Sequence, residues 1–198
     1  MTTDEKPSDT ENKTPWLRFG EQREATFIDS VAPEIGLAAR KNPAKEDDPT
    51  ALDLLVDDAP ADLKTQETPF FTAEKTYELP PQYVVTFNAN DYRRYIDKQP
   101  LDVLFWVRWR EELSGYGAEV AAMEGVWRTP FEHIREMVGS GEAPCHTYNR
   151  RQGDPDNANA SYLLDLRTMS CIGCFTGPCD SDHTHTDDHA NHSSGFVS

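Results

Sequence analysis

Long apolar segments are absent from this chain of 198 residues. The longest unbroken apolar run covers residues 103–107, only five positions, whereas a membrane-spanning helix needs about 20. The first residues, MTTDEKPSDTENKTP, are polar and acidic, and they lack the basic and apolar segments of a signal or transit peptide. We therefore expect no membrane-spanning helix and a cytoplasmic protein.

Lysine is also scarce. The chain has 7 lysines and 12 arginines against 35 acidic residues, for a net charge of −16. This balance argues against a general nucleic-acid coating protein, because such proteins neutralise phosphates with a basic surface. Few lysines, many carboxylates and an apolar fraction of 37% resemble halophilic proteins. At molar salt the Debye length is only ~3 Å, so an acidic surface then barely repels phosphate. The alternative interpretation is an acidic protein that works at ordinary salt concentrations and has disordered ends.

Composition divides the chain into three parts. Residues 1–15 show no apolar periodicity and are expected to form a disordered arm. Residues 16–170 are expected to form one domain, in which helices interleave with strands, so the predicted class is α/β, bordering on α+β. Residues 171–198 are rich in Cys and His and are expected to form a tail with a flexible end.

The pattern of apolar and turn residues predicts individual elements within this domain. Helices are expected at 15–31, 90–99 (capped by Asn90) and 129–138, and an extended segment at 68–77. The expected strands are 37–40, 52–56, 61–66, 82–87, 101–109, 119–128 and 161–166.

Two acidic residues and a lysine lie on a predicted hairpin. Asp53 heads one apolar strand, and after an acidic turn Asp62, Lys64 and Gln66 follow on the returning strand. Alternate side chains of a strand share a face, so Asp62, Lys64 and Gln66 are expected to point the same way. Mg²⁺ is commonly bound by one or two carboxylates. An adjacent lysine can position an attacking water and stabilise charge on a phosphate. The alternative interpretation is a surface hairpin with solvated charges.

This pattern resembles the PD-(D/E)xK nuclease superfamily. Asp53 matches the first acidic residue of that family, Asp62 and Lys64 match its (D/E)xK pair, and Gln66 matches a glutamine found in several branches. The chain departs from the pattern in having Leu52 where the family has proline, and Asp62 where glutamate is commoner. The resemblance implies a restriction-endonuclease-like core, with a central mixed sheet flanked by helices.

The resemblance also implies a function and a ligand set. A glutamate of the first helix often joins the metal site in this family; Glu24 matches it, with Glu21 as the rival. Asp53, Asp62 and Glu24 would bind Mg²⁺ or Mn²⁺, Lys64 would orient the attacking water, and Gln66 would support it. The implied activity is endonucleolytic hydrolysis of DNA, and a homodimer is one expected assembly.

Four cysteines, at 145, 171, 174 and 179, form a separate cluster in the sequence. The spacing of Cys171, Cys174, Cys179 and His183 is that of a Cys₃His zinc site, and Cys145 with His146 is an alternative source of the fourth ligand. Disulfides are rare in a reducing cytoplasm, so a structural zinc clip is one prediction. A tail that binds metals only weakly is the other. A non-enzymatic, zinc-stabilised module that binds protein or nucleic acid is therefore the alternative function.

Overall fold

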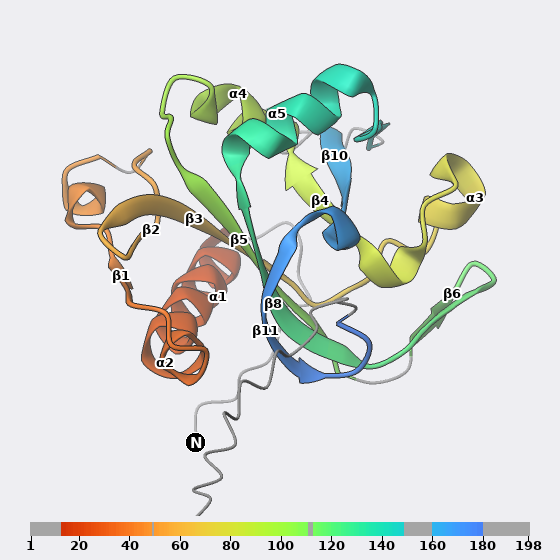
Figure 1. Ribbon diagram of the computed structural model, residues 1–198, viewed down its shortest axis with the longest axis horizontal. Helices are drawn as coiled ribbons and strands as arrows, with labels where there is room; N and C mark the ends of the chain where they lie inside the picture. Colours follow the sequence, from red (N-terminus) through yellow and green to blue (C-terminus); the bar gives the residue numbers. More distant parts are fainter. Residues whose placement is uncertain (1–12, 49, 111–112, 149–159, 180–198) are drawn as a thin grey trace, which may run out of the picture.

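A six-stranded mixed sheet forms the centre of the molecule in the computed structural model (Figure 1), which describes residues 13–48, 50–110, 113–148 and 160–179. The strand order is β1-β2-β3-β5-β8-β11. All neighbours are antiparallel except β3 and β5, which are parallel. The strands are β1 (Ala39–Lys41), β2 (Leu54–Val56), β3 (Ala59–Gln66), β5 (Asp102–Trp109), β8 (Met123–Pro130) and β11 (Ser170–Thr176).

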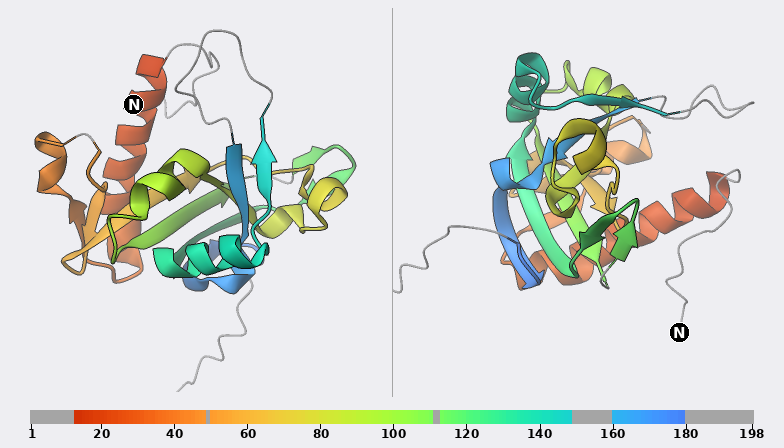
Figure 2. Two further views of the ribbon diagram at one scale, coloured as in Figure 1. Left: turned by 90° about the horizontal axis from the view of Figure 1, so that it is seen from above. Right: turned by 90° about the vertical axis from the view of Figure 1, so that its right-hand side faces the viewer.

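Helices cover both faces of this sheet, which confirms the predicted α/β class (Figure 2). One face carries α1 (Lys13–Thr26), its continuation η1 (Phe27–Val31) and the short α2 (Ala32–Glu34). The opposite face carries α4 (Ala89–Tyr95), α5 (Phe131–Ser140) and a three-stranded sheet of β4 (Val84–Asn88), β10 (Ala160–Asp165) and β9 (Cys145–Thr147). The central sheet is therefore the middle layer of three.

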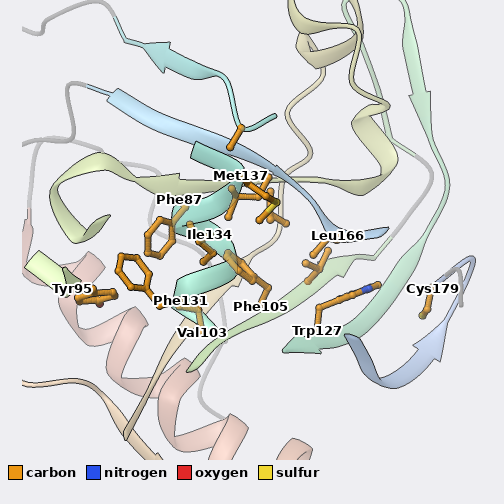
Figure 3. Packing of buried hydrophobic residues seen from close by; sticks show 14 of the residues in the cluster. Phe87, Tyr95, Val103, Phe105, Trp127, Phe131, Ile134, Met137, Leu166 and Cys179 are labelled. Carbon is orange, nitrogen blue, oxygen red and sulfur yellow. The ribbon is translucent and has the colours of Figure 1, made fainter. Parts of the chain in front are cut away.

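The alternation of side chains along β5 divides the core in two. Val103, Phe105, Val107 and Trp109 belong to one buried cluster, with residues of α5, β4 and β10. Figure 3 shows Phe105 of this cluster near Phe87, Phe131, Ile134 and Met137. Leu104 and Trp106 point to the other face and pack with Phe27 of η1. A strand buried on both faces is apolar throughout, and this explains the run at 103–107.

The connection from β3 to the parallel strand β5 crosses the face that α5 also covers. It passes through α3 (Ala73–Tyr77), the 3₁₀ turn η3 (Pro81–Tyr83), β4 and α4 before β5 begins. Parallel neighbours need such a long crossover. In this way α4 comes to lie beside β3.

Several predicted elements differ from the structure in their type or at their ends. Residues 73–77 form helix α3 where an extended segment was expected. Asn88 caps α4, accepting a hydrogen bond from the Asn90 amide, so Asn90 is inside the helix and is not its cap. Pro33 does not end the first helical segment, which continues to Glu34, because proline is tolerated in the first turn of α2.

The boundary expected at residue 171 is also wrong, because β11 (Ser170–Thr176) pairs with β8 and completes the central sheet. The domain therefore extends through the described residues up to Cys179. Residues 1–12 and 180–198, which hold most of the predicted arm and tail, lie outside the described part. None of the helices in the described part is both long and apolar enough to cross a membrane.

Candidate active site at the end of the β2–β3 hairpin

A two-residue turn sets the register that brings Asp53 and Asp62 together. Asp57 and Asp58 form this turn between β2 and β3, both with positive φ (51° and 65°). Two-residue hairpin turns favour positive φ, and aspartate tolerates it better than most residues. Leu54 then pairs with Ala61. Asp53 and Asp62 are the next residues outward on the two chains, at the point where the ladder ends.

The Asp62 carboxyl group is buried beside Asp53. The residue is 2% exposed, and its Oδ2 lies 2.7 Å from Lys64 Nζ, but this oxygen accepts no hydrogen bond of good geometry from the described residues. Burial raises the pKa of Asp62, and the positive charge of Lys64 opposes this effect. The negative charge of Asp53 and a hydrogen bond between the two carboxyl groups also favour the protonated form of Asp62, so its pKa is raised overall. Two carboxyl groups in contact repel each other when both are ionised, and a cation relieves that repulsion.

Lys64 points to the same place as Asp62, as the alternation along β3 predicts. Its Nζ lies 2.6 Å from Asp91 Oδ2 and 3.5 Å from the Tyr95 hydroxyl, both on α4. Burial lowers the pKa of Lys64, but its interactions with Asp62, Tyr95 and Asp91 outweigh burial and raise the pKa well above its ordinary value. Lys64 is therefore protonated at neutral pH and acts as a fixed positive charge and hydrogen-bond donor.

The contribution of α4 was not predicted from the sequence. Asp91 and Tyr95 are four residues apart, so they share one face of the helix. Asp91 also pairs with Arg94, at 2.7 Å. Burial, together with the nearby carboxylates, raises the pKa of Tyr95, so its hydroxyl remains protonated. The i, i+4 spacing is a visible signal, but only the crossover topology places this face over Lys64.

Lys45 is a second lysine at the site and was likewise not predicted. It lies in the 3₁₀ turn η2 (Pro43–Glu46) between β1 and β2. Its Nζ donates a hydrogen bond to Asp53 Oδ1 and lies 3.7 Å from Glu24 Oε2. Burial lowers the pKa of Lys45, but contact with Asp53 and the charges of Glu24 and Asp62 outweigh it and raise the pKa.

Glu24 approaches the site from α1, across a pocket. The pocket lies between α1 and β3 and is lined in part by Glu21, Glu24, Lys45, Asp53 and Thr65. Glu24 is ion-paired with Lys45, and its side chain is 14% exposed. Both candidate glutamates therefore face this pocket, and the ion pair with Lys45 favours Glu24 over Glu21.

Gln66 is not part of the Lys64 cluster. Its Oε1 accepts a hydrogen bond from the Thr86 amide at 3.0 Å, and its Nε2 donates to the Thr68 carbonyl at 3.3 Å. These contacts join the end of β3 to β4. The hydrogen bonds of Gln66 therefore run to Thr86 and Thr68 and give it a structural role between β3 and β4.

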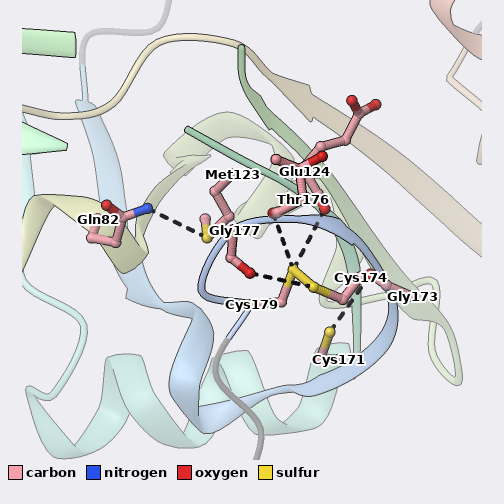
Figure 4. Close-up of a disulfide and its surroundings, with 9 residues drawn as sticks. All are labelled: Gln82, Met123, Glu124, Cys171, Gly173, Cys174, Thr176, Gly177 and Cys179. Atoms are coloured by element: carbon pink, nitrogen blue, oxygen red, sulfur yellow. Dashed lines mark hydrogen bonds between the residues drawn. A yellow bond between two sulfur atoms is a disulfide. The ribbon is translucent and has the colours of Figure 1, made fainter. Parts of the chain in front are cut away.

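The predicted zinc ligands adopt a different arrangement (Figure 4). Cys174 and Cys179 form a disulfide, with an S–S distance of 2.08 Å and a Cα–Cα distance of 5.7 Å. Disulfide sulfurs are not thiolates, and zinc binds thiolate. Cys171 remains a free, half-buried thiol, and Cys145 is free and exposed. His183 lies outside the described residues. His146 is held in a hydrogen bond of 2.8 Å between its Nδ1 and the Tyr77 hydroxyl.

In the described part of the chain, no three carboxylate, imidazole or thiol groups lie close enough to hold an ion together. Asp53 and Asp62 contact each other, and Lys45 links Asp53 to Glu24. Comparisons with protein-family models, with curated proteins and with solved structures found no match to this chain.

Proposed function

We propose that this protein is a metal-dependent nuclease that hydrolyses phosphodiester bonds in DNA at the Asp53–Asp62–Lys64 site. The observation that carries the proposal is the contact between the Asp53 and Asp62 carboxyl groups at the open end of the β2–β3 ladder, with Lys64 beside Asp62. A three-layer architecture around a mixed sheet, as expected for a restriction-endonuclease-like core, also supports it.

The residues present fit a hard divalent cation such as Mg²⁺ or Mn²⁺. Asp53 and Asp62 supply two adjacent carboxylates, and Mg²⁺ is commonly held by one or two carboxylates with several waters. Asp62 Oδ2 is buried and lies 2.7 Å from the Lys64 ammonium, so this oxygen already accommodates a positive charge. The Lys45 ammonium lies at Asp53 and near Glu24, so a cation already occupies this position.

Each side chain has a defined task in the proposed reaction. When bound, the metal would polarise the phosphate and lower the pKa of a coordinated water. Asp53 and Asp62 would bind it, with Glu24 as the outer carboxylate. Lys64 keeps its proton, so it orients the attacking water and stabilises negative charge that develops on the phosphate, and it does not act as the base. Asp91 and Tyr95 hold Lys64 in place.

The substrate is proposed to approach the pocket between α1 and β3, because Asp53 and Glu24 both line it. The net charge of −16 opposes DNA binding at low salt, but screening at molar salt removes most of that repulsion. A homodimer would place two such sites on the two strands of a duplex.

The test is a cleavage assay on plasmid, linear and branched DNA, and on RNA, in molar KCl with Mg²⁺ or Mn²⁺. We expect metal-dependent cutting of DNA, and a loss of about 100-fold or more in rate for Lys64→Gln, because a fixed charge at the reacting group is removed. Lys75→Gln, which changes an exposed lysine of α3, is the matched control and should cut normally. Failure of the folded protein to cut any DNA, or cutting that survives Lys64→Gln, would overturn the proposal.

A further inference from the structure

We infer that the Lys45 ammonium occupies the cation position of the proposed metal site, so that a divalent ion must displace it in order to bind. The inference rests on the proposed function and identifies Lys45 as a positioning residue that sets the affinity for the metal. Lys45 lies outside the hairpin motif from which the metal site was predicted.

The three carboxylates proposed to hold the metal all act on Lys45. Its Nζ contacts Asp53 directly and is 3.7 Å from Glu24, and the charge of Asp62 also acts on it. These residues come from three separate places: α1, the chain entering β2, and β3. The ammonium therefore lies between Asp53 and Glu24, where the charge of Asp62 also reaches it.

The loop between β1 and β2 holds Lys45 in this place. The Asn42 amide donates to the Asp53 carbonyl at 3.0 Å, and Asn42 Nδ2 donates to the Leu52 carbonyl at 3.0 Å. Asn42 Oδ1 also accepts from the Ala44 amide, which caps the turn that carries Lys45. Backbone and side-chain bonds thus fix the start of the Lys45 turn to the segment that carries Asp53.

Competition follows from this geometry. A divalent ion and an ammonium group cannot occupy the same space, and both are attracted by the same carboxylates. Lys45 neutralises part of the carboxylate charge in the metal-free protein, which lowers the repulsion between Asp53, Asp62 and Glu24. Removing the ammonium should therefore destabilise the metal-free protein and increase its affinity for the metal.

The experiment measures Mn²⁺ binding to the full-length protein without DNA, by isothermal titration calorimetry and by the electron paramagnetic resonance signal of free Mn²⁺. We expect the Kd of Lys45→Met for Mn²⁺ to be about tenfold lower than that of the wild type. Lys45→Arg keeps the positive charge and should bind no more tightly than the wild type.

The matched control is Lys41→Met. Lys41 is exposed on β1, so this variant has the same change in net charge without removing the contact with Asp53, and its Kd should equal that of the wild type. Thermal unfolding supplies a second measurement. In EDTA, the Tm of Lys45→Met should be lower than that of the wild type. Saturating Mn²⁺ should raise the Tm of Lys45→Met by more than it raises the Tm of the wild type. If Lys45→Met does not fold in EDTA, Lys45→Gln takes its place.

The outcomes separate this inference from the proposed function. Equal Kd values for Lys45→Met and Lys41→Met would overturn the inference, and so would weaker binding by Lys45→Met. If Asp53→Asn abolishes Mn²⁺ binding in either of those cases, the proposed metal site survives. Absence of Mn²⁺ binding in both the wild type and Lys45→Met would overturn the inference and the metal-dependent function together.

Discussion

Among single residues, the four cysteines differ in state. Cys174 and Cys179 are joined in a disulfide, Cys145 is exposed, and Cys171 is half-buried. Burial raises the pKa of the Cys171 thiol. Alkylation requires the thiolate, so we expect Cys145 to react with iodoacetamide before Cys171 at pH 7.5, and Cys171 to react faster as the pH rises. Peptide mass spectrometry after timed alkylation measures both rates.

The same digest decides between the disulfide and the zinc clip. Without a reductant, the peptides that carry Cys174 and Cys179 should be linked and unmodified, and they should become alkylated only after treatment with dithiothreitol. Alkylation of both residues without reductant, together with one zinc ion per chain by atomic absorption, would contradict the disulfide and restore the zinc prediction.

The proximity of Asp53 to Asp62 could be predicted from the sequence because it depends on local geometry. A short turn between two strands fixes which residues face each other, and alternation then places Lys64 on the side of Asp62. Lys45 and Asp91 could not be predicted in this way. Lys45 lies on an irregular loop, and Asp91 reaches Lys64 only because a crossover lays α4 beside β3. Such contacts depend on the tertiary arrangement, and no spacing in the sequence encodes them.

Among the secondary-structure elements, the hairpin of β6 (Leu113–Gly115) and β7 (Ala118–Val120) has an unfavourable residue at its tip. Its two-residue turn is Tyr116–Gly117, with φ of 53° and 85°. Positive φ is unfavourable for tyrosine, whereas Asn-Gly is a preferred pair in this kind of turn. Tyr116 is 83% exposed, so its side chain contributes little packing. We expect Tyr116→Asn to increase the free energy of unfolding by about 1 kcal/mol, measured by urea denaturation.

Tyr116→Ala is the control for this effect. It removes the same exposed ring but retains a residue that is unfavourable at positive φ, so it should not stabilise the protein. Equal stabilisation by both variants would show that the ring, and not the backbone conformation, is the source of the gain.

The wrong predictions among the elements have a common cause. Residues 68–77 are rich in threonine and aromatic residues, which favour strands, yet α3 forms there because Ala73 is fully buried against Val84 and Leu163. The β11 segment contains glycine and cysteine and has no strong strand pattern, but β8 offers it an edge for pairing. In both cases tertiary contacts outweigh the local preference of the sequence.

In the molecule as a whole, the excess of acidic residues is the most prominent property. Eight of the 35 acidic residues lie in residues 1–12 and 180–198, so most of the negative charge belongs to the central part of the chain. Several arginines there are already paired with carboxylates, as Arg128 is with Asp102 and Arg23 with Glu67. The remaining carboxylates repel one another, and this repulsion destabilises the compact state.

Salt should therefore stabilise the folded protein. Raising KCl from 0.1 M to 1 M shortens the Debye length from ~10 Å to ~3 Å, and we expect Tm to rise by about 5 °C or more, equivalent to roughly 2 kcal/mol for a chain of this size. Differential scanning calorimetry over this range measures the change. Sucrose of equal osmolality is the control, since it favours burial without screening charge, and it should give a smaller rise. A Tm that stays constant or falls with KCl would contradict the halophilic interpretation and favour an acidic protein adapted to ordinary salt.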